Sequence, residues 1–282
     1  MTVETVGVVG LGTMGAGIAQ IAALAGNEVV GREVSEELGE RARERIAHYL
    51  GRGVEKGRLT AEERDAALAR LTTTTDLADL ADCDVVIEAI VEDPEAKRET
   101  FRALEEVVGE GAVLATNTSA LSVTAIAQKT ERPERVVGMH FFNPAPVLPL
   151  VEVVRTELSS DEAVETAYGL AERLGKEPIR CNDTPGFVVN RILIPLLNDC
   201  VRVLDEAGVS PEDLDKAMTR GVNWPIGPCA LIDLIGVDIH VHASEALHDA
   251  LGEPRMAPPE RLVRMRDEGL LGRKSGRGFF AY

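Results

Sequence analysis

The chain has 282 residues, of which 45% are hydrophobic and 27% are charged, a composition typical of a globular protein and a length that favours two domains. Its formal net charge of −17 argues against nucleic acid or an anionic membrane surface as the main partner. The apolar runs are short or interrupted by glycine and proline, so no membrane span is predicted. Four dispersed cysteines favour neither disulfides nor a metal site, and we expect a cytoplasmic protein.

The first predicted elements are a β-branched strand over residues 6–9 and a helix over residues 13–25, joined by the sequence GLGTMG. A GxGxxG motif between a strand and a helix is the context that a dinucleotide-binding fold requires. We expect Gly10 to allow a tight turn, Gly12 to let the backbone approach a pyrophosphate, and Gly15 to let helix and strand pack closely. The N-terminus of the helix then offers unpaired N–H groups to the phosphates.

The second predicted strand covers residues 28–34 and carries Glu33, which lies 18 residues after Gly15. A carboxylate at this place accepts hydrogen bonds from the adenosine ribose hydroxyls and repels a 2′-phosphate, which favours NAD over NADP. Arg32 stands beside it, and an arginine could instead pair with that phosphate. NAD is therefore the expected cofactor, and NADP stays possible.

Residues 39–58 form a local basic stretch, with six basic residues against three acidic ones. The ordinary interpretation is a solvated helix face along which Glu40 and Glu44 alternate with Arg41 and Arg45. In so acidic a chain, a basic stretch could also receive an anionic ligand that the global field repels.

Further buried strands are predicted over residues 83–90, 112–116 and 135–142, because each is a nearly unbroken apolar run. In a doubly wound sheet, ligands bind outside the carboxyl ends of the strands. The polar side chains that fall at such ends are Glu88, Glu92, Asn117, Ser119 and His140.

His140 lies in an otherwise apolar stretch, GMHFFNPAPVLPLVE, which ends twelve residues later at Glu152 between Val151 and Val153. One interpretation is a core histidine that is hydrogen-bonded to the backbone. The other is a general base and the carboxylate that orients it, since imidazole takes up and releases protons near neutral pH.

Near Asp183 the pattern changes from strands to helices. The predicted helices cover residues 188–208, a segment that starts after an N-cap at Ser210, residues 230–251 and residues 258–269. Asn190 falls in the first of these helices, where a helix-start hydrogen bond and a site role are equally open. The sequence predicts an α/β fold: a Rossmann-like, doubly wound, mainly parallel sheet over residues 1–185, followed by a smaller all-helical domain over residues 186–282.

Over essentially its full length the sequence resembles the L-3-hydroxyacyl-CoA dehydrogenase family, and within it the short 3-hydroxybutyryl-CoA dehydrogenase type. The resemblance is carried by GLGTMGAGIAQ, DCDVVIEAIVED, ATNTSALSV, GMHFFNPAPVLPLVEVV, DTPGFVVNRILIP, NWPIGP and GRKSGRGFF. It implies NAD-dependent oxidation of a short-chain (3S)-3-hydroxyacyl-CoA and dimerisation through the helical domain. Two positions depart from the family pattern: Glu33 replaces the usual aspartate, and Ala120 replaces the second serine of NTSS.

The resemblance also implies roles for individual residues: His140 is the catalytic base and Glu152 its partner, Ser119 and Asn190 contact the substrate, and Arg52 and Lys56 meet the CoA phosphates. We assign the cofactor to Gly10, Gly12, Thr13, Met14, Gly15, Glu33, Glu92, Lys97 and Asn117, and we expect no metal. Three alternatives stay open: a dehydrogenase of a free hydroxy acid, one of a carrier-protein-bound acyl group, and a non-catalytic NAD-binding homologue.

Overall fold

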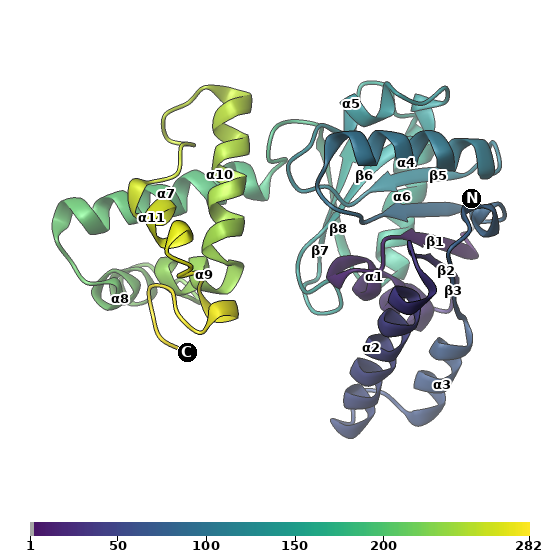
Figure 1. The fold of residues 1–282 in the computed structure, drawn as a ribbon, viewed down its shortest axis with the longest axis horizontal. Helices are drawn as coiled ribbons and strands as arrows, with labels where there is room; N and C mark the ends of the chain where they lie inside the picture. Colours follow the sequence, from purple (N-terminus) through teal and green to yellow (C-terminus); the bar gives the residue numbers. More distant parts are fainter. Residues whose placement is uncertain (1–2) are drawn as a thin grey trace. The chain divides into compact units, whose positions relative to one another are not determined.

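The computed structural model describes residues 3–282, and the chain divides into two compact units, Met1–Thr184 and Pro185–Tyr282. The first unit is a sheet covered by helices, and the second is helical (Figure 1). This architecture confirms the predicted fold class.

Eight strands form the sheet of the first unit, in the spatial order β3-β2-β1-β4-β5-β6-β7-β8. Six of the seven neighbouring pairs are parallel, and β6 and β7 are antiparallel. The chain order reverses between β1 and β4, and in such sheets a crevice opens at the carboxyl ends of the two strands that flank this point. The strands are β1 (Thr5–Val9), β2 (Glu28–Arg32), β3 (Leu71–Thr74), β4 (Val85–Glu88), β5 (Val113–Thr116), β6 (Val136–Phe141), β7 (Leu150–Arg155) and β8 (Glu177–Asn182).

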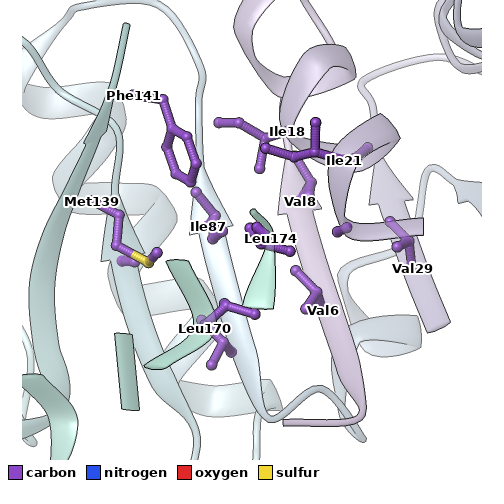
Figure 2. Close-up of a cluster of buried hydrophobic side chains, with 14 of the residues drawn as sticks. Val6, Val8, Ile18, Ile21, Val29, Ile87, Met139, Phe141, Leu170 and Leu174 are labelled. Atoms are coloured by element: carbon purple, nitrogen blue, oxygen red, sulfur yellow. The ribbon is translucent and has the colours of Figure 1, made fainter. Parts of the chain in front are cut away.

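One face of the sheet packs against two helices, α1 (Thr13–Leu24) and α6 (Asp161–Arg173), which contribute Ile18, Ile21 and Leu170 to a single buried cluster. Figure 2 shows these side chains beside Val8, Met139 and others from the strands. Burying each large aliphatic side chain stabilises the fold by roughly 1.5–3 kcal/mol.

The opposite face of the sheet carries the polar side chains. Because side chains alternate along a strand, Met139 and Phe141 in the cluster place His140 on the other face, and Val151 and Val153 do the same for Glu152. The helices α4 (Pro94–Val107) and α5 (Val123–Ala127) pack against each other and cover this face (Figure 1).

Two further helices of the first unit, α2 (Glu36–Glu55) and α3 (Ala61–Ala69), project together away from the sheet (Figure 1). Ala42, Ile46 and Leu50 recur every four residues on the buried side of α2. A capping box between Thr60 and Glu63 starts α3. Short 3₁₀ helices complete the unit at η1 (Leu77–Leu80) and η2 (Pro133–Arg135).

The second unit consists of α7 (Val189–Ala207), α8 (Pro211–Gly221), α9 (Pro228–Ile235), α10 (Val237–Leu251), α11 (Glu260–Asp267) and the 3₁₀ helix η3 (Arg273–Ser275). Ser210 caps α8 through its side chain, as predicted. The stretch from residue 230 to 251 forms two helices because Gly236, with φ +104, breaks it. No helix within residues 3–282 has the length and apolar character needed to cross a membrane.

Candidate active site

His140 and Glu152 form a buried pair across the antiparallel strands β6 and β7, where they lie directly opposite each other. The His140 Nδ1 atom is 2.6 Å from Glu152 Oε2, and the two residues are 3% and 0% exposed. A carboxylate can only accept, so Nδ1 carries the proton and donates it. In the neutral imidazole this leaves Nε2 with the basic lone pair.

Ser119 faces the other side of the imidazole from the loop that follows β5. Its Oγ atom lies 3.1 Å from His140 Nε2. The ring of Phe142 packs 4.5 Å from the imidazole, centroid to centroid, at 52°. The basic nitrogen therefore has a hydroxyl within hydrogen-bond distance and an aromatic ring beside it.

Glu92 fixes the loop that carries Ser119. Its Oε1 atom accepts hydrogen bonds from Thr118 Oγ1 at 2.5 Å, Ser119 N at 2.8 Å and Ala120 N at 3.1 Å. Burial alone would raise the pKa of Glu92, but the Lys97 ammonium and then the hydrogen bonds to this loop outweigh it and hold the pKa below its ordinary value. Ala120 donates through its backbone, so this bond does not need the serine that the family pattern has there.

Lys97 supplies the balancing charge from inside the protein. It is 1% exposed, and its Nζ atom lies 2.7 Å from Glu88 Oε1 and 3.3 Å from Glu92 Oε2. Glu88 is itself fully buried and accepts from Thr116 Oγ1 at 2.8 Å on the adjacent strand. Asp93 caps α4 and so sets Lys97 in the first turns of that helix. A buried charge is tolerated when it is paired in this way.

The glycine loop between β1 and α1 has the geometry expected of a pyrophosphate cradle. Gly10 has φ +85, and a Cβ on Gly15 would lie 1.8 Å from the Gly10 carbonyl oxygen, so neither position suits a larger residue. A Cβ on Gly12 would meet nothing within 4 Å, and no side chain caps the helix. The open side of the loop and the N–H groups of Thr13 and Met14 therefore fit an anionic group.

Glu33 connects the end of β2 to this loop. Its Oε1 atom accepts from Leu11 N at 2.7 Å and its Oε2 atom from Val34 N at 3.0 Å. Arg32 turns to the neighbouring strand, where its Nε atom donates to Thr75 O at 3.3 Å. The carboxylate therefore stands beside the glycine loop.

Arg45 is a residue that sequence reasoning missed, since it was expected on a solvated helix face. It is half-buried, and its guanidinium donates to the carbonyl oxygens of Leu11 and Gly12. Arg41 on the same helix does match that expectation, because its ion pair with Glu37 is exposed. The basic stretch was a signal in the sequence, but nothing in it distinguished one arginine from another.

The remaining predicted residues are spread more widely. The Asn117 side-chain oxygen accepts from Phe141 N at 2.9 Å and so ties the Ser119 loop to β6. Arg52 and Lys56 are exposed at the far end of the 20-residue helix α2. Asn190 belongs to the second unit, in the first turn of α7.

Among the described residues, neither a metal site nor a thiol of low pKa accompanies this cluster. Within residues 3–282, no group of three or more His, Cys, Asp or Glu side chains could hold a metal ion. Burial raises the pKa values of Cys83 and Cys181 to about 12, so these thiols stay protonated.

Known proteins match the chain over both units. Family models described as 3-hydroxyacyl-CoA dehydrogenase match it over residues 5–184 (NAD binding domain) and 186–282 (C-terminal domain). It is 46% identical to a 3-hydroxybutyryl-CoA dehydrogenase of Mycobacterium tuberculosis, with 99% of each chain covered. It is 45% identical to a probable 3-hydroxybutyryl-CoA dehydrogenase of Deinococcus radiodurans, with 98% of this chain and 99% of that one covered. The crystal structure of (S)-3-hydroxybutyryl-CoA dehydrogenase from Ralstonia eutropha superposes with a TM-score of 0.96 at 42% identity, covering 100% of this chain and 99% of that one.

Proposed function

This chain belongs to the 3-hydroxyacyl-CoA dehydrogenase family of oxidoreductases, and we propose that it reversibly oxidises a short-chain (3S)-3-hydroxyacyl-CoA, such as 3-hydroxybutyryl-CoA, to the 3-oxoacyl-CoA with NAD. The observation that carries the proposal is the buried imidazole of His140, placed between the Glu152 carboxylate and the Ser119 hydroxyl.

His140 is the general base in this proposal. Its Nε2 atom accepts the proton of the substrate hydroxyl, and Glu152 stabilises the imidazolium that forms. The pair is buried, which strengthens the attraction between the two charges. Ser119, close to the same nitrogen, holds the substrate oxygen within reach of the base. In the reverse direction His140 returns the proton to that oxygen.

The cofactor residues in this proposal are Gly10, Gly12, Thr13, Met14 and Gly15 at the pyrophosphate, Glu33 at the adenosine ribose, and Glu92, Lys97 and Asn117 toward the nicotinamide end. The open glycine loop and its uncapped helix support this assignment. When bound, NAD⁺ accepts a hydride from C3 of the substrate.

The substrate in this proposal contacts Ser119 and Asn190 near the reacting carbon and Arg52 and Lys56 at the CoA phosphates. The exposed, basic end of α2 supports an anionic ligand there. We assign residues 1–185 to NAD binding and residues 186–282 to substrate binding and to a homodimer contact. Four free cysteines are typical of a reducing compartment, which supports a cytoplasmic enzyme.

The test is the rate of NADH oxidation with acetoacetyl-CoA, measured beside free acetoacetate and beside NADPH. Rapid turnover confined to the thioester with NADH is the expected result. Turnover of free acetoacetate but not of the thioester would contradict the proposed substrate. A preference for NADPH would contradict the role of Glu33 while leaving the reaction in place.

A further inference from the structure

We propose that Arg45 is a positioning residue for the cofactor, which orients the backbone N–H donors that bind its pyrophosphate. The inference rests on the proposed function, because it takes the glycine loop as the dinucleotide site. Arg45 lies outside the GxGxxG motif, and its contacts join α2 to a loop more than thirty residues earlier in the chain.

Arg45 reaches the loop because of how α2 packs. Ala42 and Ile46 are buried where α2 packs against the rest of the first unit, and Arg45 is half-buried beside them. One of its terminal nitrogens donates to Leu11 O at 2.6 Å and to Gly12 O at 2.9 Å. Both acceptors are backbone carbonyls of the loop, and hydrogen bonds from a charged donor are stronger than neutral ones.

The position of these carbonyls decides where the following N–H groups point. A trans peptide is planar, and its C=O and N–H bonds point in opposite directions. Binding the Leu11 and Gly12 carbonyls toward α2 therefore turns the N–H groups of Gly12 and Thr13 the other way. The Gly12 carbonyl also accepts from Ala16 N at 3.0 Å, as the first bond of α1, which favours the same orientation. A Cβ on Gly12 would meet open space, so room for a ligand exists beside this peptide.

Glu33 acts on the same loop residue from the opposite side. It accepts from Leu11 N at 2.7 Å while Arg45 donates to Leu11 O, so both backbone polar groups of Leu11 are bound by charged side chains. The loop is thereby set before a ligand arrives, which lowers the ordering cost of binding. Arg45 also brings a positive charge to the loop in a chain whose formal net charge is −17.

The same helix provides matched controls. Arg43 also donates to two backbone carbonyls, those of Leu68 and Leu71, but these belong to the end of α3 and the start of β3. Arg41 makes an exposed ion pair with Glu37. The three arginines therefore separate three roles: an anchor of the glycine loop, an anchor elsewhere, and a surface charge.

The experiment is a fluorescence titration of NADH, with ADP-ribose and adenosine as competitors, on the full chain and on Arg45→Met, Arg45→Lys, Arg43→Met and Arg41→Met. We expect Arg45→Met to raise the dissociation constants of NADH and ADP-ribose about tenfold. Adenosine, which has no phosphate, should bind it unchanged. Arg45→Lys should bind NADH more tightly than Arg45→Met does. In Arg45→Met the KM for NADH should rise, while kcat at saturating NADH stays within about twofold of the parent value. Arg43→Met should lower the unfolding temperature without weakening NADH.

The outcomes test the role of Arg45 separately from the proposed dehydrogenase activity. If Arg45→Met keeps its fold and the parent affinity for NADH, the inference is wrong. If Arg45→Met does not fold, Arg45→Gln takes its place, and unchanged NADH affinity in that neutral, shorter variant would overturn the inference in the same way. NADH binding without thioester turnover would contradict the proposed substrate only, and the ranking of the variants would still decide the role of Arg45. A parent chain that binds no NADH would contradict both.

Discussion

His140 in the first unit and His240 in the second are both buried histidines, at 3% and 0% exposure, but their ring nitrogens meet different chemistry. His140 has a carboxylate at Nδ1 and a serine hydroxyl at Nε2. The Nε2 atom of His240 lies 2.9 Å from the side-chain oxygen of Asn198, and its Nδ1 atom has no hydrogen-bond partner among residues 3–282. Burial lowers the pKa of His240 to about 4. Burial therefore keeps His240 neutral, whereas His140 differs from it in having a carboxylate partner.

The largest expected effect comes from removing the base. His140→Ala should slow turnover by at least about 10³-fold, since proton transfer loses its acceptor, while NADH affinity stays nearly unchanged. Steady-state rates with acetoacetyl-CoA and an NADH titration check both parts. His240→Gln is the matched control and should keep the parent rate. A strong loss of activity in His240→Gln, or of NADH affinity in His140→Ala, would contradict the assignment of a catalytic role to His140 and not to His240.

The next largest effect concerns the carboxylate partner. Glu152→Gln still accepts a hydrogen bond from His140 Nδ1, but it cannot stabilise the imidazolium with a full charge. We expect kcat to fall by about 10²-fold to 10³-fold, with the KM for NADH within about twofold. An unchanged kcat would mean that the pair is structural.

His240 predicts a loss of stability in acid. Its pKa is lowered from 6.5 to about 4 by burial in the folded chain, so the unfolded chain binds more protons between these values. The free energy of unfolding therefore falls as the pH drops through this window, by about 3 kcal/mol at its lower end. Urea denaturation from pH 7 to pH 4 measures this slope, and His240→Gln should flatten it. Equal slopes in the two proteins would contradict the pKa of a buried, neutral His240.

The smallest expected effect is at the position that departs from the family pattern. Ala120→Ser should leave kcat and KM within about twofold, because residue 120 acts through the N–H that it donates to Glu92. Steady-state kinetics with acetoacetyl-CoA checks this. A gain of tenfold or more in kcat would show that a hydroxyl at residue 120 contributes to catalysis near His140.

Much of the first unit could be predicted from its apolar runs and from the polar residues that follow them. Unbroken apolar runs identify β4 and β6 as buried strands, and polar residues at their ends then lie along one edge of the sheet. Glu88 and His140 follow from this rule. The structure shows the contact between His140 and Glu152 that the second interpretation requires, and the role of His140 as a base stays a prediction.

Other features needed the fold. Which partner Lys97 meets depends on how α4 packs over β4, and the sequence does not specify this packing. Arg45 and Arg43 look alike in the sequence, and they differ because successive helix positions point in different directions. The neutral state of His240 depends on its burial, and its hydrogen-bond partner Asn198 lies 42 residues earlier on another helix.

The single antiparallel pairing in the sheet makes the His140–Glu152 pair sensitive to the length of the strands that carry it. Both residues come from neighbouring strands, so their alignment depends on the ladder that the two strands form. One residue gained or lost inside β7 before Glu152 would turn its side chain to the hydrophobic face, beside Met139 and Phe141. A change of strand length would therefore separate the pair even though neither residue is substituted.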